Sequence, residues 1–106
     1  MNTTYEINLL KDTILKSTDC EKIYLFGSRA YGNPNKDSDY DFWVVLNDNS
    51  ANKYEILENI YWNIAQSSIN ASVDVLASRK SRFEERSKAP TLEKKVKTDG
   101  VLLYAK

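Results

Sequence analysis

The sequence predicts an α/β fold in which a small mixed β-sheet is flanked by helices. Stretches with helical spacing of apolar residues alternate with short apolar runs rich in β-branched and aromatic residues. Such alternation is typical of helices packed on a sheet. The chain has 106 residues, 42% hydrophobic and 28% charged, which is ordinary globular composition and suits a single domain over residues 1–106.

The first half of the chain predicts a helix, a strand, a turn and a second strand. Residues 4–17 carry apolar side chains at helical spacing, and 22–26 is a short apolar run that ends at Gly27. Residues 32–38 are rich in turn formers, and 40–46 is a mostly apolar strand that we expect to be buried on both faces. The apolar positions of the helix are Ile7, Leu10, Ile14 and Leu15.

The middle of the chain predicts a loop, a second helix and a third strand. Residues 47–52 are polar, and the helix covers about 52–66. Residues 72–76 alternate between apolar and polar, as a half-buried strand does. The apolar positions of this helix are Ile56, Leu57, Ile60, Tyr61 and Ile64.

The last third predicts two helices and a closing edge strand. Residues 81–84 (Ser-Arg-Phe-Glu) have the form of a capping box and predict the start of a short helix. Pro90-Thr91 begins a further helix with Leu92 and Val96 on one face, and Gly100 is well placed to end it. Residues 101–104 predict the edge strand.

The charge balance argues against a general nucleic-acid binder, because 15 basic and 15 acidic residues give no net charge. The distribution is uneven: residues 79–97 hold eight basic and three acidic residues. This basic region is either a solvated helical surface or a cationic flank for a triphosphate or an acidic partner. We expect no stable binding of nucleic acid.

Several classes of protein are excluded by what the sequence lacks. It has no histidine, so His-based triads and His-ligated zinc are ruled out, and acid–base chemistry falls to carboxylates, hydroxyls or lysine. Cys20 is the only cysteine, so no disulfide can form within the chain, and we expect a buried structural thiol. No apolar stretch approaches the ~20 residues of a membrane span, and 1–6 lacks a signal-peptide pattern. We therefore expect a cytoplasmic protein with no membrane partner.

A Gly-Ser turn follows the first predicted strand, within Phe26-Gly27-Ser28-Arg29-Ala30-Tyr31-Gly32. Glycine allows a tight turn and the close approach of a phosphate, and N–H groups at a helix start with the Ser28 hydroxyl can bind phosphate oxygens. The alternative is an ordinary turn.

Two carboxylates, Asp39 and Asp41, stand at the start of the second strand. Strand side chains alternate between faces, so both point to one side of the sheet, ~7 Å apart. Such a pair suits Mg²⁺, which binds one or two carboxylates together with substrate phosphates. The alternative is a hydrophilic entry into the strand.

A third carboxylate, Asp74, lies inside the apolar run Ser-Val-Asp-Val-Leu. Aspartate is disfavoured in strands and costly to bury without a partner, so we expect it beside Asp39 and Asp41. Three clustered carboxylates can hold two divalent cations, and Asp74 is then the candidate general base. The alternative places Asp74 on a solvent-exposed face.

These residues together resemble a known family. Gly27-Ser28 followed by Asp39-Tyr40-Asp41-Phe42 is similar to the signature of the DNA polymerase β-like nucleotidyltransferases, and the longer match is most like the minimal nucleotidyltransferase (MNT) subgroup. The resemblance extends through 73–76 to 99–104 and covers nearly the whole chain. It implies the nucleotidyltransferase fold.

The resemblance also implies a function. ATP would be the substrate, bound through Gly27, Ser28 and Arg29, with Mg²⁺ (two ions) held by Asp39, Asp41 and Asp74 as the catalytic carboxylates. AMP would pass to a tyrosine of a HEPN-type toxin encoded by an adjacent gene, so that this chain is the antitoxin. Two alternatives stay open: a non-catalytic antitoxin that acts by occlusion through aromatic residues such as Trp62, Tyr61 or Tyr31, and a transferase acting on a small molecule such as an antibiotic.

Overall fold

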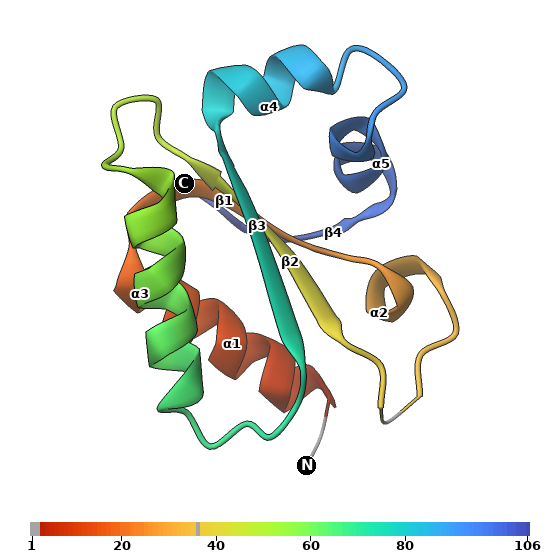
Figure 1. Cartoon of the computed structure of the whole chain (residues 1–106). Helices are drawn as coiled ribbons and strands as arrows, with labels where there is room; N and C mark the ends of the chain where they lie inside the picture. The colour runs from red at the N-terminus through yellow and green to blue at the C-terminus, as the bar shows by residue number, and fades with distance from the viewer. Residues whose placement is uncertain (1–2, 36) are drawn as a thin grey trace.

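A computed structural model describes residues 3–35 and 37–106 and contains an alternating series of helices and strands (Figure 1). The order predicted from the sequence is confirmed, except that a short helix, α2, lies where only a turn was predicted between the first two strands. The elements are α1 (Thr3–Ser17), β1 (Cys20–Phe26), α2 (Ser28–Tyr31), β2 (Tyr40–Leu46), α3 (Lys53–Ala65), β3 (Val73–Arg79), α4 (Lys80–Arg86), α5 (Leu92–Asp99) and β4 (Val101–Ala105).

The strands form one mixed sheet in the order β3-β2-β1-β4. β1 is antiparallel to both β2 and β4, whereas β2 and β3 are parallel and are connected through α3. The predicted mixed sheet and the edge position of 101–104 are therefore confirmed. Because β1 runs against its neighbours, the end of β1 meets the beginnings of β2 and β3, and this edge of the sheet is where the candidate site lies.

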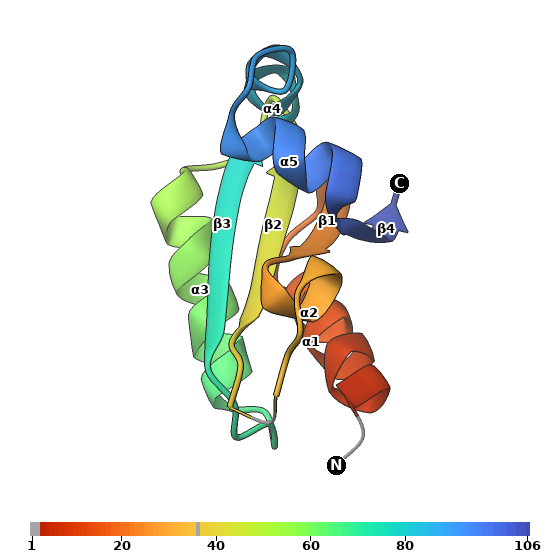
Figure 2. The same cartoon turned by 90° about the vertical axis from the view of Figure 1, so that its right-hand side faces the viewer.

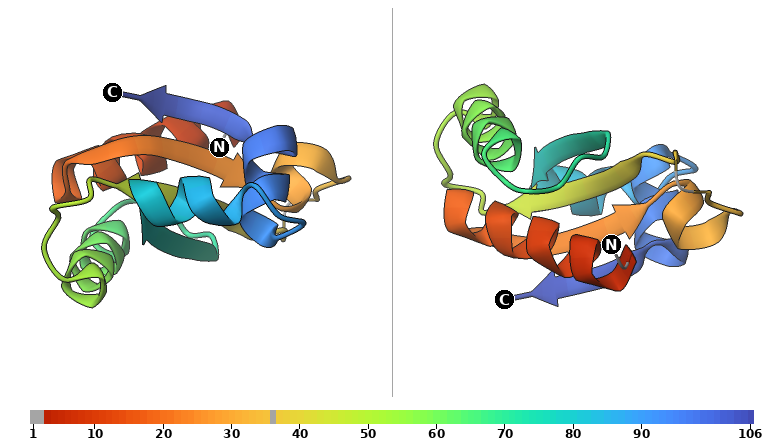
Figure 3. Two further views of the ribbon diagram at one scale, coloured as in Figure 1. Left: turned by 90° about the horizontal axis from the view of Figure 1, so that it is seen from above. Right: turned by 90° about the horizontal axis from the view of Figure 1, so that it is seen from below.

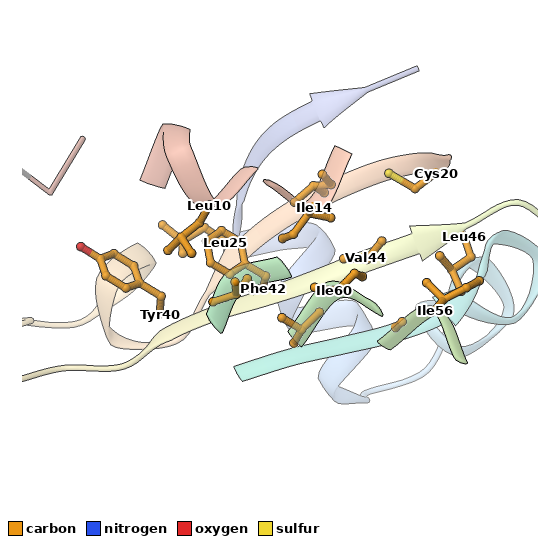
Figure 4. Packing of buried hydrophobic residues seen from close by; sticks show 14 residues of the cluster. Leu10, Ile14, Cys20, Leu25, Tyr40, Phe42, Val44, Leu46, Ile56 and Ile60 are labelled. Carbon is orange, nitrogen blue, oxygen red and sulfur yellow. The ribbon is translucent and has the colours of Figure 1, made fainter. Parts of the chain in front are cut away.

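Helices cover both faces of the sheet (Figures 2 and 3). α1 and α3 pack on one face, where fourteen buried side chains form the main core, among them Leu10, Ile14, Phe42, Val44 and Ile60 (Figure 4). α4 and α5 cover part of the opposite face through a smaller cluster. The members of that cluster are Tyr24, Phe26, Trp43, Val45, Phe83 and Val96. β2 is thus buried on both faces, as its apolar sequence predicts.

Side-chain caps define the starts of two helices. The Asn52 side chain accepts a hydrogen bond from the Tyr54 N–H at 2.8 Å at the start of α3, and the Thr91 hydroxyl accepts from the Lys94 N–H at 3.2 Å at the start of α5. Gly100 follows α5, where a Cβ would come within 2.5 Å of the Val96 carbonyl oxygen. Glycine is needed there for close approach.

The predicted capping box over 81–84 is wrong. α4 begins at Lys80, so Ser81 lies inside its first turn and cannot be the N-cap. The Ser81 N–H donates instead to the Asp48 carboxylate at 2.9 Å. This first-turn N–H is therefore satisfied by a side chain from the loop after β2, a contact across 33 residues that a local motif cannot reveal.

The face predicted for α5 is only half right. Val96 is fully buried, but Leu92 is 46% exposed. Glu93 is buried in its place and accepts a 2.5 Å hydrogen bond from the Arg86 side chain. That ion pair joins α4 to α5, and a buried carboxylate needs such a partner. None of the helices in the described ranges has both the length and the apolar character to cross a membrane.

Candidate functional site

Gly27 shapes the bend between β1 and α2. Its backbone, with φ 74° and ψ −161°, lies in a region that only glycine adopts readily. A Cβ at this position would meet Asp41 Oδ2 at 2.2 Å. The Gly27 carbonyl accepts hydrogen bonds from the Ala30 and Tyr31 N–H groups at 3.0 and 3.1 Å, which forms the turn of α2. Gly27 is therefore required both for its conformation and for the space that the Asp41 carboxylate fills.

Asp41 and Asp74 are directly paired in the sheet. Asp41 is opposite Asp74 in the parallel register of β2 and β3, and opposite Phe26 on the other side. Register partners on parallel strands project to the same face and are separated by the strand spacing of ~4.8 Å. This register places Asp74 beside Asp41 on the neighbouring strand, and the Asp74 side chain is exposed there.

Asp39 is the residue before the first residue of β2 and is exposed. Its backbone is fixed on the following side by Tyr40, whose N–H donates to the Ser72 carbonyl at 2.9 Å and so joins β2 to the entry of β3. Ser28 is also exposed, at the first position of α2. Asp41 of β2, Asp74 of β3 and the Gly27-Ser28 bend therefore lie at one edge of the sheet, next to Asp39.

The electrostatics of the site are clearest at Asp41, where two neighbouring carboxylates act on a half-buried one. The pKa of Asp41 is raised, first by burial, then by the negative charge of Asp74, and then by that of Asp39. Like charges disfavour the ionised form, and a cation placed among them would reverse this effect. A bound cation would therefore favour the ionised form of the half-buried Asp41.

The donor set fits Mg²⁺ when a substrate supplies further oxygens. Within 3–35 and 37–106, no three acidic, histidine or cysteine side chains converge closely enough to form a metal site by themselves. Mg²⁺ is usually bound by one or two carboxylates plus phosphates and water. The Asp41–Asp74 pair, with Asp39 nearby and Gly27 leaving room for the Asp41 side chain, provides hard oxygen ligands of this kind.

Arg29 has partners within the protein. Its Nε and Nη2 donate to the Ser38 carbonyl at 3.0 and 2.8 Å, and Nη2 also donates to the Asn35 carbonyl at 3.3 Å. The guanidinium lies 4.0 Å from the centre of the Tyr40 ring. These contacts hold the chain just before Asp39.

The sheet face that carries the carboxylates is apolar beyond them. Trp43 is buried two residues after Asp41 and donates from Nε1 to the Ser78 hydroxyl at 3.1 Å. Leu76, its register partner on β3, is 42% exposed on the same face as Asp74. α4 and α5 lie toward one end of this face (Figure 2), and Asp39 and Asp74 are exposed at the other end.

The predicted basic region of 79–97 is mostly a paired and solvated surface. Its side chains form ion pairs with acidic groups, for example Lys80 with Glu21 and Lys88 with Glu85. One of them reaches the site: Lys95 Nζ lies 4.5 Å from the centre of the Tyr31 ring, at the end of α2. This cation pairs with Asp99 at 3.0 Å.

Two features of the site were not found from the sequence. The Tyr40 hydroxyl donates to Glu6 of α1 at 2.6 Å, across 34 residues, and Lys95 lies over Tyr31 although 64 positions separate them. Neither contact has a local sequence signal. The Arg29 hydrogen bonds span six to nine residues. The sequence signal for them is an arginine close to a segment rich in turn formers.

The comparisons with known proteins agree with the fold. Residues 8–106 match the family model "Polymerase beta, Nucleotidyltransferase". No curated protein matches the chain. Among solved structures, it is similar to a Sulfolobus solfataricus protein provisionally assigned as a nucleotidyltransferase, with a TM-score of 0.57 and 20% identity over 94% of this chain and 78% of that one. It is also similar to a chain of a toxin–antitoxin complex with AMP-PNP, with a TM-score of 0.50 and 22% identity over 100% of this chain and 75% of that one.

The fold and the family model together define the class: this is a domain of the nucleotidyltransferase type. The chain belongs to the polymerase β-like nucleotidyltransferase family, since the family model covers nearly all of it.

Proposed function

We propose that this chain is an Mg²⁺-dependent nucleotidyltransferase that transfers AMP from ATP to a tyrosine of a HEPN-type toxin and so acts as its antitoxin. The observation that carries the proposal is the register of Asp41 with Asp74, beside the Gly27 bend, in a chain of the nucleotidyltransferase family. Two carboxylates held side by side on adjacent strands, one of them half-buried, repel each other unless a cation binds between them.

The residues of the site divide the work of phosphoryl transfer. Gly27 and Ser28 would lie against the triphosphate, next to the Asp41 carboxylate that fills the space beside Gly27. Asp39, Asp41 and Asp74 would hold Mg²⁺, which neutralises the triphosphate and acidifies the acceptor hydroxyl when bound. Asp74, exposed on the open face, is placed to accept the proton of the acceptor. Catalysis is then largely positioning and charge stabilisation.

Two considerations support a protein acceptor. Asp74 and Leu76 are exposed on the same sheet face, which supports the approach of an acceptor carried by a protein. A chain of similar fold is part of a toxin–antitoxin complex with AMP-PNP. A partner would then supply the rest of the acceptor site.

The proposal is tested by incubating the chain with Mg²⁺, ATP labelled at the α-phosphate, and the HEPN-type product of the neighbouring gene. We expect label on a tyrosine of that partner, mapped by mass spectrometry. Asp39→Asn/Asp41→Asn is expected to lower the rate by at least about a hundredfold, since it removes the charges that hold the cation. Asp12→Asn, on the far side of α1, is the matched control and is expected to keep full activity.

No transfer by the wild-type chain, or undiminished transfer by Asp39→Asn/Asp41→Asn, would contradict the proposal. In a parallel reaction with ATP labelled at the γ-phosphate, transfer of that label to the partner would indicate a kinase and would contradict the proposal equally.

A second candidate, occlusion of the partner without catalysis, is favoured by aromatic side chains on the outer face of α3. Tyr54 is 72% exposed and Trp62 is 65% exposed, and exposed aromatic residues are common anchors of interfaces. Full neutralisation of the toxin by Asp39→Asn/Asp41→Asn, combined with its loss in Trp62→Ala, would favour occlusion.

A further inference from the structure

The Arg29 side chain grips the backbone on one side of Asp39. Nε and Nη2 converge on the Ser38 carbonyl at 3.0 and 2.8 Å, and Nη2 reaches the Asn35 carbonyl at 3.3 Å. The same turn is closed by the Ser38 N–H, which donates to the Asn35 carbonyl at 3.1 Å, and by the Asn35 N–H, which donates to the Ser38 hydroxyl at 2.9 Å. Hydrogen bonds from a charged donor are stronger than neutral ones.

The other side of Asp39 is held by Tyr40. Its ring is fully buried and lies 4.0 Å from the Arg29 guanidinium. Its hydroxyl donates to Glu6 of α1 at 2.6 Å, and its N–H donates to the Ser72 carbonyl. The Arg29 guanidinium therefore contacts both neighbours of Asp39. Its N–H groups donate to the Ser38 carbonyl, and its face lies over the Tyr40 ring.

Asp39 needs this support more than the other two carboxylates. Asp41 and Asp74 are inside β2 and β3, where the sheet hydrogen bonds hold their backbones. Asp39 is exposed and precedes β2, so its backbone has no strand partner in the register of β1 and β2 or of β2 and β3. A ligand carried on a turn is accurately placed only if its supporting contacts are rigid.

We infer that Arg29 is a positioning residue, which holds Asp39 for cation binding through the Ser38 carbonyl and the Tyr40 ring, and is not a ligand of the phosphates. The inference rests on the proposed function for the role of Asp39. Two observations favour it: Nε and Nη2 are already bound to carbonyl oxygens, and the guanidinium face is stacked on a buried ring. Lysine cannot replace these contacts, because it lacks the planar fork and stacks differently.

The test compares Arg29→Lys with wild type, and Arg82→Lys on the outer surface of α4 is the matched control. The first readout uses protein without metal or nucleotide: the exchange rate of the Ser38 amide, measured by NMR. We expect Arg29→Lys to raise this rate at least tenfold, while amides inside β2 keep their rates. Arg82→Lys is expected to leave both unchanged.

The second readout separates positioning from phosphate binding. Binding of Mn²⁺ in the presence of saturating ATP is measured by electron paramagnetic resonance, and AMP transfer is measured over a range of Mg²⁺ and of ATP. Loss of a residue that supports metal ligands typically costs 10–100-fold in metal affinity. We expect Arg29→Lys to weaken Mn²⁺ binding by about tenfold or more, with the KM for ATP at saturating Mg²⁺ changed less than twofold.

Three results would overturn the inference. An unchanged Ser38 exchange rate in Arg29→Lys would show that the grip on the turn is not significant. A large rise in the KM for ATP with unchanged Mn²⁺ binding would make Arg29 a phosphate ligand. Absence of Mn²⁺–ATP binding by the wild-type chain would instead overturn the proposed function, and with it the metal-binding role of Asp39 that Arg29 is inferred to support.

Discussion

Replacing Gly27 by alanine tests whether the bend is built around the Asp41 carboxylate. Two costs arise at once, because φ 74° with ψ −161° is a conformation that alanine adopts poorly, and because the new Cβ would lie 2.2 Å from Asp41 Oδ2. The backbone strain is about 1–3 kcal/mol. Relief of the overlap by moving a packed side chain costs about 1–3 kcal/mol more.

We therefore expect Gly27→Ala to lower the free energy of unfolding by about 2–6 kcal/mol, a large share of the ~5–15 kcal/mol typical of a domain. The measurement is urea unfolding followed by tryptophan fluorescence and by far-UV circular dichroism. Coincident transitions from the two probes support the two-state analysis.

The matched control is the double-mutant cycle with Asp41→Ala. In that background the clash partner is gone, so Gly27→Ala is expected to cost only the backbone strain, and the coupling free energy is expected to be about 1–3 kcal/mol. A loss below about 1 kcal/mol in the single mutant, or no coupling in the cycle, would refute this account of the bend.

Three further predictions concern stability and reactivity. Asp41→Asn is expected to stabilise the metal-free protein at pH 7 by about 0.5–2 kcal/mol. The pKa of Asp41 is raised in the folded state, so the protonated carboxyl favours folding below the unfolded-state pKa. This effect is lost as the pH rises through the folded-state pKa, and the neutral amide of asparagine avoids that loss. The gain is measured by urea unfolding. Tyr61→Phe is expected to cost about 1–2 kcal/mol, because the Tyr61 hydroxyl accepts from the Val75 N–H at 2.7 Å and donates to the Val75 carbonyl at 3.3 Å on the outer edge of β3. Burial raises the pKa of the Cys20 thiol from 9.0 to about 11, so the native thiol is expected to react with a disulfide reagent at pH 8 at least a hundredfold more slowly than in urea. The same shift contributes stability of about 3 kcal/mol below pH 9 that is lost between pH 9 and 11, and Cys20→Ala is expected to lack this loss.

Each of these has a contrary outcome. Equal or lower stability of Asp41→Asn would mean that neither burial nor the charges of Asp74 and Asp39 disfavour the ionised Asp41 carboxylate in the folded chain. A neutral Tyr61→Phe would show that water satisfies the edge of β3 equally well. Rapid labelling of native Cys20 would place the thiol at the surface.

Much of the fold was predictable because its signals are local. β2 was predicted with its observed bounds, Tyr40–Leu46, since turn formers precede it and its apolar run is continuous. α3 was predicted to within one residue at each end, because helical spacing and an Asn52 cap coincide. The last helix and edge strand were recognised from Thr91 and Gly100.

The errors arose where distant residues override a local pattern. Ser81 resembles an N-cap, but α4 starts earlier, so Ser81 lies inside its first turn and donates its own N–H to the Asp48 carboxylate from the loop after β2. Leu92 shares a face with Val96 by spacing, but α4 reaches α5 through Arg86, which buries Glu93 instead. β3 extends to Arg79, beyond the apolar run, because β2 continues to pair with it.

The sequence by itself determined which residues could do the chemistry: with no histidine available, the aspartates beside a glycine–serine turn are the groups that suit a hard cation and a triphosphate. Only the tertiary structure decided how they meet. The parallel pairing of β2 with β3 sets Asp74 opposite Asp41, and the Arg29 contacts place Asp39 at the same edge. Register and long-range contacts depend on packing across the whole sheet, and one strand's own residues do not specify its neighbour.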